Sequence, residues 1–116
     1  MTKFQNKELD IVLKCLDKAV VYNKIVYDLK PITPFFDYSV VVSVDSSRQG
    51  HAAVDYLRDD AMKNNMIVKG YADSPDSRWY LVDLNNIIVH IFVKEERERF
   101  NLDGLYYNLD KIIIED

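Results

Sequence analysis

Cysteine and glycine are scarce in this chain of 116 residues. A single cysteine, Cys15, excludes an internal disulfide framework and a cysteine-based zinc site, and favours a reducing cytoplasm as the compartment. The glycines at positions 50, 70 and 104 stand alone, so the chain lacks a glycine-rich phosphate loop. No run of about 18 apolar residues occurs, which excludes a membrane-spanning helix. The opening MTKFQNKELD turns polar too early for a signal peptide.

Positively charged residues are fewer than negatively charged ones. The 15 Lys and Arg residues are outnumbered by 19 Asp and Glu, which gives a formal net charge of -4. Because nucleic-acid phosphates are bound mainly by Lys and Arg, we expect no direct sequence-specific nucleic-acid binding, and a basic protein partner fits the charge better. A small RNA-binding patch could still form from the lysines at positions 14, 18, 24 and 30, but their simpler interpretation is as solubilising residues.

The apolar residues, 48% of the chain, suffice for one hydrophobic core, so we expect a single domain over residues 1–116. Helical spacing predicts a helix from Asn6 to about Val20, with Cys15 as a packing residue beside its apolar face. Ser46 or Ser47 should cap a second helix that ends near residues 64–65, and Gly50 weakens its first turn. The charged run EERER after Lys94 is typical of a solvated helix face.

Strands are predicted between and after these helices. They cover residues 24–29, 37–45, 78–84 and 87–93, with shorter β-prone segments at 66–71 and 112–114 and a loop at ADSPDS. The segment DYSVVVSVD, with four valines, predicts a buried central strand. Asn85 and Asn86 predict a two-residue hairpin turn. The order of elements indicates an α+β fold, in which helices flank a mixed β-sheet.

The predicted hairpin has two different faces, because strand residues two apart share a face. One face pairs Leu84 with Ile87, Val82 with Val89 and Tyr80 with Ile91, and this apolar face should be core. The other pairs Asp83 with Ile88, Leu81 with His90 and Trp79 with Phe92. Two interpretations of this mixed face stay open: an interface, in which Trp buries a large area while His and Asp orient a partner, or a face covered by a helix.

Patterns that carry catalysis or bind metals are missing. His51 and His90 lie on different predicted elements and belong to no metal-binding motif, and no G-x-S-x-G elbow is present to aim a serine. We therefore expect no metal, no cofactor and no catalytic residue.

Several ordered blocks from about Asn23 to Tyr106 resemble one known family. The blocks are Asp28; Asp37-Tyr38 and the valines after it; Ser46 to Arg48 with Ala52 and Asp55; Gly70-Tyr71; Trp79, Asp83, His90, Phe92 and Arg97; and Leu102 to Tyr106. Together they resemble the bacterial ribosomal silencing factors, also called Iojap-like proteins. The sequence departs from the family pattern at Gln49 (usually His), Val44 (Gly), Asn85-Asn86 (Gly-Asp) and Tyr106 (Trp).

The resemblance implies a protein that binds the large ribosomal subunit through ribosomal protein number fourteen. It implies that the bound protein sterically blocks the small subunit and represses translation when nutrients are limiting. The partner-binding residues would be Trp79 and Asp83, with Leu81, His90 and Phe92 beside them, and the protein could also form a homodimer.

An alternative is a factor in large-subunit assembly. The resemblance also implies a fold similar to nucleotidyltransferases, whose sites need a Gly-Ser turn and an Asp-x-Asp pair to hold two magnesium ions. Here Asp37 has no second carboxylate two residues on, so an enzyme is disfavoured.

Overall fold

A computed structural model describes residues 4–72 and 77–115 of the protein. Its elements in chain order are α1 (Lys7–Leu16), β1 (Tyr22–Asp28), β2 (Tyr38–Val44), α2 (Ser47–Lys63), β3 (Gly70–Ala72), β4 (Trp79–Asp83), β5 (Ile87–Val93), α3 (Lys94–Phe100), α4 (Leu102–Leu105) and β6 (Lys111–Ile113). The strands form one mixed sheet in the order β3-β4-β5-β2-β1-β6, in which β2 and β5 are parallel and the other neighbours antiparallel. The predicted α+β class is confirmed.

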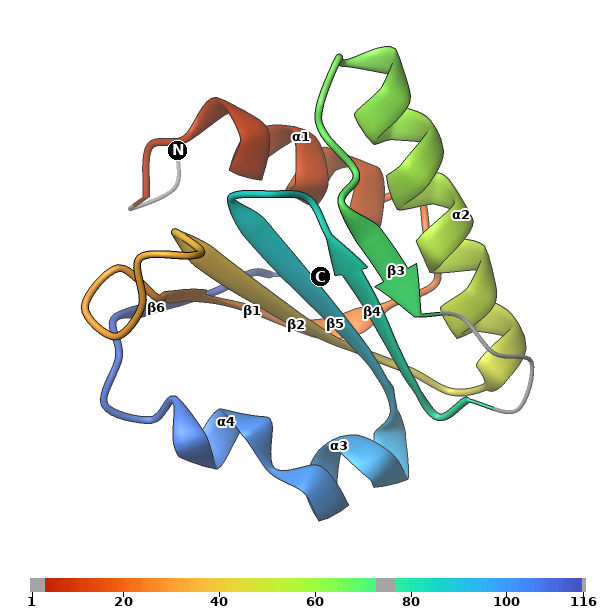
Figure 1. Ribbon diagram of the computed structural model, residues 1–116. Coiled ribbons are helices and arrows are strands. Elements are labelled where there is room, and N and C mark those ends of the chain that lie inside the picture. The colour runs from red at the N-terminus through yellow and green to blue at the C-terminus, as the bar shows by residue number, and fades with distance from the viewer. Residues whose placement is uncertain (1–3, 73–76, 116) are drawn as a thin grey trace.

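The helices lie on both faces of the sheet (Figure 1). α1 and α2 cover one face, and the main core lies between them and the sheet. α3 and α4 lie against the opposite face, where a smaller cluster gathers Tyr27, Val41, Phe92 and Leu102. β2 runs through the middle of the sheet and all of its residues are buried, as the run of valines predicts.

α1 begins where the sequence predicts and ends earlier. The Asn6 side chain accepts a hydrogen bond from the Leu9 N–H at 2.9 Å, which caps the first turn. The helix stops at Leu16 because the next N–H groups, of Lys18 and Ala19, bond to carbonyls three residues back. Val20, expected on the buried face, is therefore 66% exposed.

α2 runs its predicted length, and Gly50 has a packing role in it. Ser46 caps the helix by accepting from the Gln49 N–H, and the Gln49 side chain accepts in turn from the Asp45 N–H. A Cβ at Gly50 would lie 2.4 Å from the buried Tyr80 ring. Glycine therefore lets α2 approach β4 closely, which outweighs its poor helix propensity.

The β4–β5 hairpin has the predicted register, with Trp79 opposite Phe92, Leu81 opposite His90 and Asp83 opposite Ile88. The Leu84 N–H donates to the Ile87 carbonyl at 2.9 Å to close the turn. Of the two turn residues, Asn85 alone has a positive φ, 74°. The non-glycine residues with positive φ in the described ranges are all asparagines, at positions 23, 65, 85 and 101, and no described glycine has one.

The edges of the sheet differ from the sequence prediction. β3 forms at residues 70–72 and not over 66–71, because Met66 turns into the core instead of extending a strand. Of the predicted loop ADSPDS, residues 73–76 lie outside the described part of the chain. At the other edge, the β-prone tail forms β6 beside β1.

Candidate partner-binding face

Three side chains of β4 lie on the sheet face opposite α1 and α2. Trp79, Leu81 and Asp83 are each half-buried, and across the strand pair they meet Phe92, His90 and Ile88. We call Trp79, Leu81, Asp83, His90 and Phe92 the Trp79 face. The hairpin thus brings together all five residues expected to bind a partner.

Trp79 and His90 are joined directly. The Trp79 indole N–H donates to Nδ1 of His90 at 3.2 Å, and the two rings lie nearly parallel with centroids 5.9 Å apart. This bond fixes the orientation of the indole on the face. It also requires that Nδ1 of His90 carry no proton.

His90 is 7% exposed, and its burial lowers the pKa to about 4. The imidazole is therefore neutral at physiological pH. Its ring stacks on Phe92 at a centroid distance of 6.1 Å and an interplanar angle of 11°. These properties fit a residue that shapes a surface better than one that transfers protons near neutral pH.

Phe92 is fully buried, so it offers no surface to a partner. Its ring stacks against the indole of Trp79, with ring centroids 5.4 Å apart and an interplanar angle of 13°. Phe100 of α3 packs against both rings, 4.6 Å from Trp79 and 5.8 Å from Phe92. The two interpretations of the mixed face therefore apply to different parts of it: α3 covers the Phe92 end, and the β4 side chains remain accessible.

Asp83 provides a carboxylate at the far end of the face. Its Oδ1 accepts from the Asn85 N–H at 2.9 Å, which also ties it to the hairpin turn. Its backbone pairs with Gly70 of β3, and Leu81 pairs with Ala72. Because Gly70 and Ala72 have small side chains or none, they leave the side chains of Asp83 and Leu81 uncovered on that side.

Phe100, 42% exposed, extends the Trp79 face, and the sequence did not single it out. Its aromatic side chain at the end of a charged run was the available signal. Its contact with Trp79 depends on the way α3 folds back from β5.

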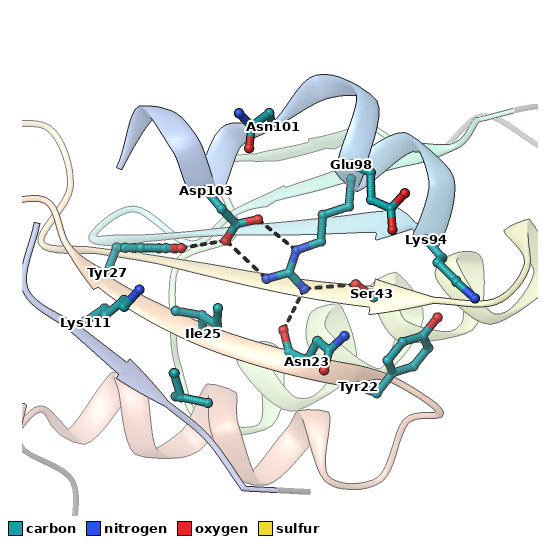
Figure 2. Close-up of a pocket in the computed structure, with 12 residues that line it drawn as sticks. Tyr22, Asn23, Ile25, Tyr27, Ser43, Lys94, Glu98, Asn101, Asp103 and Lys111 are labelled. Carbon is teal, nitrogen blue, oxygen red and sulfur yellow. Dashed lines mark hydrogen bonds and ion pairs between the residues drawn. The ribbon is translucent and has the colours of Figure 1, made fainter. Parts of the chain in front are cut away.

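Arg97 holds α3 and α4 against the sheet (Figure 2). Its guanidinium donates to both carboxylate oxygens of Asp103, to Ser43 Oγ of β2 and to the Asn23 carbonyl, at 2.6 to 3.2 Å. Tyr27 donates to the same Asp103 carboxylate at 2.5 Å. Burial opposes ionisation of Asp103, but the bonds from Arg97 and Tyr27 outweigh it and lower its pKa. Arg97 corrects the expectation that the whole EERER run is solvated, since its side chain is 10% exposed.

A cavity of about 560 Å³ adjoins Arg97 between these helices and the β1–β6 edge. Figure 2 shows Tyr22, Lys94 and Lys111 around it. The hydrogen bonds of Arg97 are made within the protein, so this arrangement serves to fix α3 and thereby Phe100.

The alternative functions find little support in the described residues. Within residues 4–72 and 77–115, no three His, Cys, Asp or Glu residues gather in a way that could hold a metal ion. Three of the four lysines of the suggested RNA patch are engaged: Lys18 pairs with Asp60, Lys24 is buried and pairs with Asp17, and Lys30 contacts Asp28 and Tyr38. Burial raises the pKa of Cys15 to about 12, which fits a packing residue. In the part of the chain described, no helix is long and apolar enough to cross a membrane.

Known proteins match both the sequence and the fold. Residues 2–116 match the family described as ribosomal silencing factor during starvation. The ribosomal silencing factor RsfS of Bacillus subtilis is 30% identical over 102 residues, 88% of this chain and 86% of that protein. The mouse protein named mitochondrial assembly of ribosomal large subunit protein 1 is 26% identical, over 85% of this chain and 45% of its own length. A crystal structure from Bacillus halodurans, 24% identical, superposes with a TM-score of 0.81 over 94% of this chain and all of that one.

The fold and the Trp79 face define a small α+β protein that presents a partly exposed aromatic face. The chain belongs to the family of ribosomal silencing factors. This identity confirms the resemblance and extends it beyond Tyr106 to the end of the sequence. Members of the family are named as ribosomal silencing factors and not as enzymes, as the sequence led us to expect.

Proposed function

We propose that the protein binds the large ribosomal subunit through ribosomal protein number fourteen, using the Trp79 face, and so prevents the small subunit from joining. The observation that carries this proposal is the half-buried Trp79, held at the surface by His90 and backed by Phe92 and Phe100. A rigid, partly exposed aromatic anchor of this kind is typical of the energetic centre of a protein interface. The net charge of -4 suits a basic ribosomal protein.

The physical mechanism is steric exclusion. A domain of 13.6 kDa bound at the joining face would occupy volume that the small subunit needs. If the two ligands exclude each other, the apparent affinity of the subunits falls as 1 + [factor]/Kd, so repression depends on docking affinity and needs no catalysis. As part of this proposal we expect the protein in the cytoplasm, together with the ribosomes it binds.

Co-sedimentation with isolated large subunits tests the proposal, with small subunits added in a second series. Wild-type protein should pellet with large subunits and lower the fraction of joined ribosomes. Trp79→Ala should weaken binding to large subunits by about 2 kcal/mol, roughly thirtyfold. Its inhibition of subunit joining should become weaker by the same factor. Tyr56→Ala is the matched control, because Tyr56 is 42% exposed but lies on α2, across the sheet.

The proposed site is wrong if folded Trp79→Ala protein binds large subunits as tightly as wild type. Equal weakening by Tyr56→Ala would also place the contact elsewhere. If wild-type protein never pellets, the proposed function itself fails.

Asp83 supplies the charge that would orient a basic partner. Asp83→Asn keeps an oxygen that can accept from the Asn85 N–H, so the turn should survive. We expect this variant to bind more slowly and with a weaker dependence on salt. Asp10→Asn, at an exposed position on α1, makes the same charge change on the other side of the sheet and should have little effect.

A role in assembling the large subunit is the second candidate, because a mouse relative is named for that process. It would use the same face on a precursor particle. Depletion of the protein should then cause large-subunit precursors to accumulate in growing cells, whereas silencing alone predicts normal precursors and excess subunit joining during starvation.

A further inference from the structure

The cavity of about 560 Å³ between α3, α4 and the β1–β6 edge has a size typical of sites for small ligands. We call it the β6 cavity. Figure 2 shows Lys111 at one end of it and Lys94 at the other, with Ile25 between them. Tyr27 and Tyr22, which line these two ends, are five residues apart on β1, a separation of roughly 16 Å in a strand. A small ligand would therefore contact only one of the two lysines closely.

The β6 cavity is lined by hydrogen-bond donors that the protein itself does not use. Within the described residues, neither Lys94 nor Lys111 has a hydrogen bond or an ion pair. Arg97 donates four bonds, which leaves one of its five N–H groups without an acceptor in that part of the chain. Ser43, 3% exposed, accepts from Arg97, but its own O–H has no acceptor among the residues described. Unused donors around a cavity favour a negatively charged ligand.

The Lys111 end is the better place for an anion. Asp103 also lines the cavity, but its two oxygens are occupied by hydrogen bonds from Arg97 and from β1, which balance its charge. Glu98 lies near Lys94, four residues further along α3, and has no ion pair in the described part of the chain (Figure 2). Its carboxylate would repel an anion at that end. A negatively charged group should therefore bind beside Lys111.

The available donors suit a phosphate better than a carboxylate. A planar carboxylate is bound best by two parallel N–H groups of an arginine, and those of Arg97 are already occupied by Asp103. What remains near Lys111 is an ammonium group and a single N–H, which act as separate point donors. Such donors fit the three outward oxygens of a phosphate monoester, for which lysine is a common partner.

An apolar wall lies beside Lys111. Ile25 and Ile113 are direct neighbours across β1 and β6, so their side chains share the face that lines the cavity. Ile113 is 63% exposed, which is unusual for a large apolar side chain next to a cavity wall. A flat apolar group lying on these two isoleucines would remove their surface from water.

We propose that the β6 cavity binds a small phosphate monoester with a flat apolar body, the phosphate beside Lys111 and the body on Ile25 and Ile113. This site does not depend on the proposed function. It lies at the β1–β6 edge of the sheet, whereas the Trp79 face lies on β4 and β5, toward the other edge (Figure 1). Trp79→Ala protein should therefore bind the phosphate ligand as wild type does. Failure of ribosome binding and failure of this site can thus be told apart.

Phenyl phosphate is a minimal probe that carries both a phosphate and a flat apolar ring. It should be titrated into the full chain and followed by heteronuclear NMR spectra. We expect shifts in the amide signals of Ile25, Lys111 and Ile113, with a Kd of about 1 mM or lower. Inorganic phosphate, which lacks the ring, and phenol, which lacks the charge, should each bind roughly tenfold more weakly.

The four ribonucleoside monophosphates are a second set of probes, because they carry the same phosphate on a larger flat body. Tighter binding of one of them than of phenyl phosphate would support the site and identify the body as a nucleobase. Tighter binding of phenyl phosphate would also support the site and identify a smaller ring.

Lys111→Met and Lys94→Met are matched variants, since each removes one exposed lysine from the cavity. Lys111→Met should weaken binding of phenyl phosphate roughly tenfold, and Lys94→Met less than about twofold. Ile113→Ser should weaken binding of phenyl phosphate and leave that of inorganic phosphate unchanged. All three positions are exposed, so the circular dichroism spectra should match that of wild type.

Three outcomes would overturn the proposal. The first is that neither phenyl phosphate nor any of the four monophosphates shifts these amide signals at about 10 mM. The second is that the two lysine variants weaken binding equally, because attraction to general positive charge would then explain it. The third is that inorganic phosphate binds as tightly as phenyl phosphate, which would leave the apolar wall without a role.

Discussion

The indole of Trp79 and the imidazole of His90 form a single unit across β4 and β5, in which the donor is the more exposed ring and the acceptor the buried one. The bond assigns a tautomer to the neutral histidine: Nδ1 accepts, so Nε2 carries the proton. The position of the exposed aromatic ring is thus linked to the protonation state of a buried group.

Trp79→Phe separates the hydrogen bond of Trp79 from its packing. Phenylalanine can still stack on Phe92 and Phe100, but Nδ1 of the buried His90 loses its donor. We expect a loss of about 1–3 kcal/mol in the free energy of unfolding, measured by urea denaturation. If His90→Leu is added, the orphaned acceptor is removed, and part of this loss should be recovered; a loss that is unchanged in the double variant would contradict a role for the bond.

Stability should fall in mild acid because of His90. Its pKa in the folded protein is about 4, below the ordinary value of 6.5, so the unfolded chain takes up the proton first as the pH falls. The contribution of His90 is therefore fully present above 6.5 and is lost as the pH falls toward 4. Between about pH 7 and pH 5 the loss should be about 2 kcal/mol.

His90→Gln is the control for this pH dependence, because its amide oxygen can still accept from Trp79 but does not titrate. The difference in stability between wild type and this variant should change with pH over the same window. Parallel curves for the two proteins would show that His90 does not cause the slope.

Arg97 should be far more important for stability than its neighbour Arg99. Arg97→Met leaves Asp103 without its main partner and frees α3 and α4, which should cost about 2–4 kcal/mol. Arg99→Met removes a pair with Glu96 whose arginine side chain is 77% exposed, and should cost less than about 0.5 kcal/mol. Urea denaturation of both variants measures the contrast, and similar losses would refute it.

Gly50→Ala should destabilise the protein although alanine is the better helix former. The added methyl group would overlap the buried Tyr80 ring, and such overpacking costs about 1–3 kcal/mol, against about 1 kcal/mol gained in helix propensity. Adding Tyr80→Leu removes the overlap, so in that background Gly50→Ala should be neutral or stabilising. Thermal unfolding of wild type, Gly50→Ala, Tyr80→Leu and the double variant measures the coupling between the two positions.

The hairpin could be predicted from the sequence because local signals agree there. Alternating apolar residues fixed which side chains share a face, and Asn85-Asn86 fixed the register. The family resemblance then selected Trp79 and Asp83 as contacts. That selection stays a prediction until binding is measured.

The covering of Phe92 could not be predicted, because it depends on contacts distant in sequence. EERER looks like a solvated run, yet Arg97 reaches Ser43 and Asn23, more than fifty residues away. This contact brings Phe100 against Trp79. Local periodicity contains no information about such a pairing. Nor does it show the end of α1, where Lys18 and Ala19 bond to carbonyls three residues back although the apolar spacing continues to Val20.

Within the described residues, four positions have a left-handed backbone, and the asparagines there have a thermodynamic consequence. Glycine adopts such angles without strain but adds conformational freedom to the unfolded chain, which folding must then remove. Asparagine tolerates the same angles with fewer unfolded conformations, and the Asn101 side chain also accepts a bond from the Gly104 N–H. The protein therefore adopts these four left-handed backbone conformations at a lower entropic cost than it would with glycine, and β-branched residues are disfavoured at all four sites.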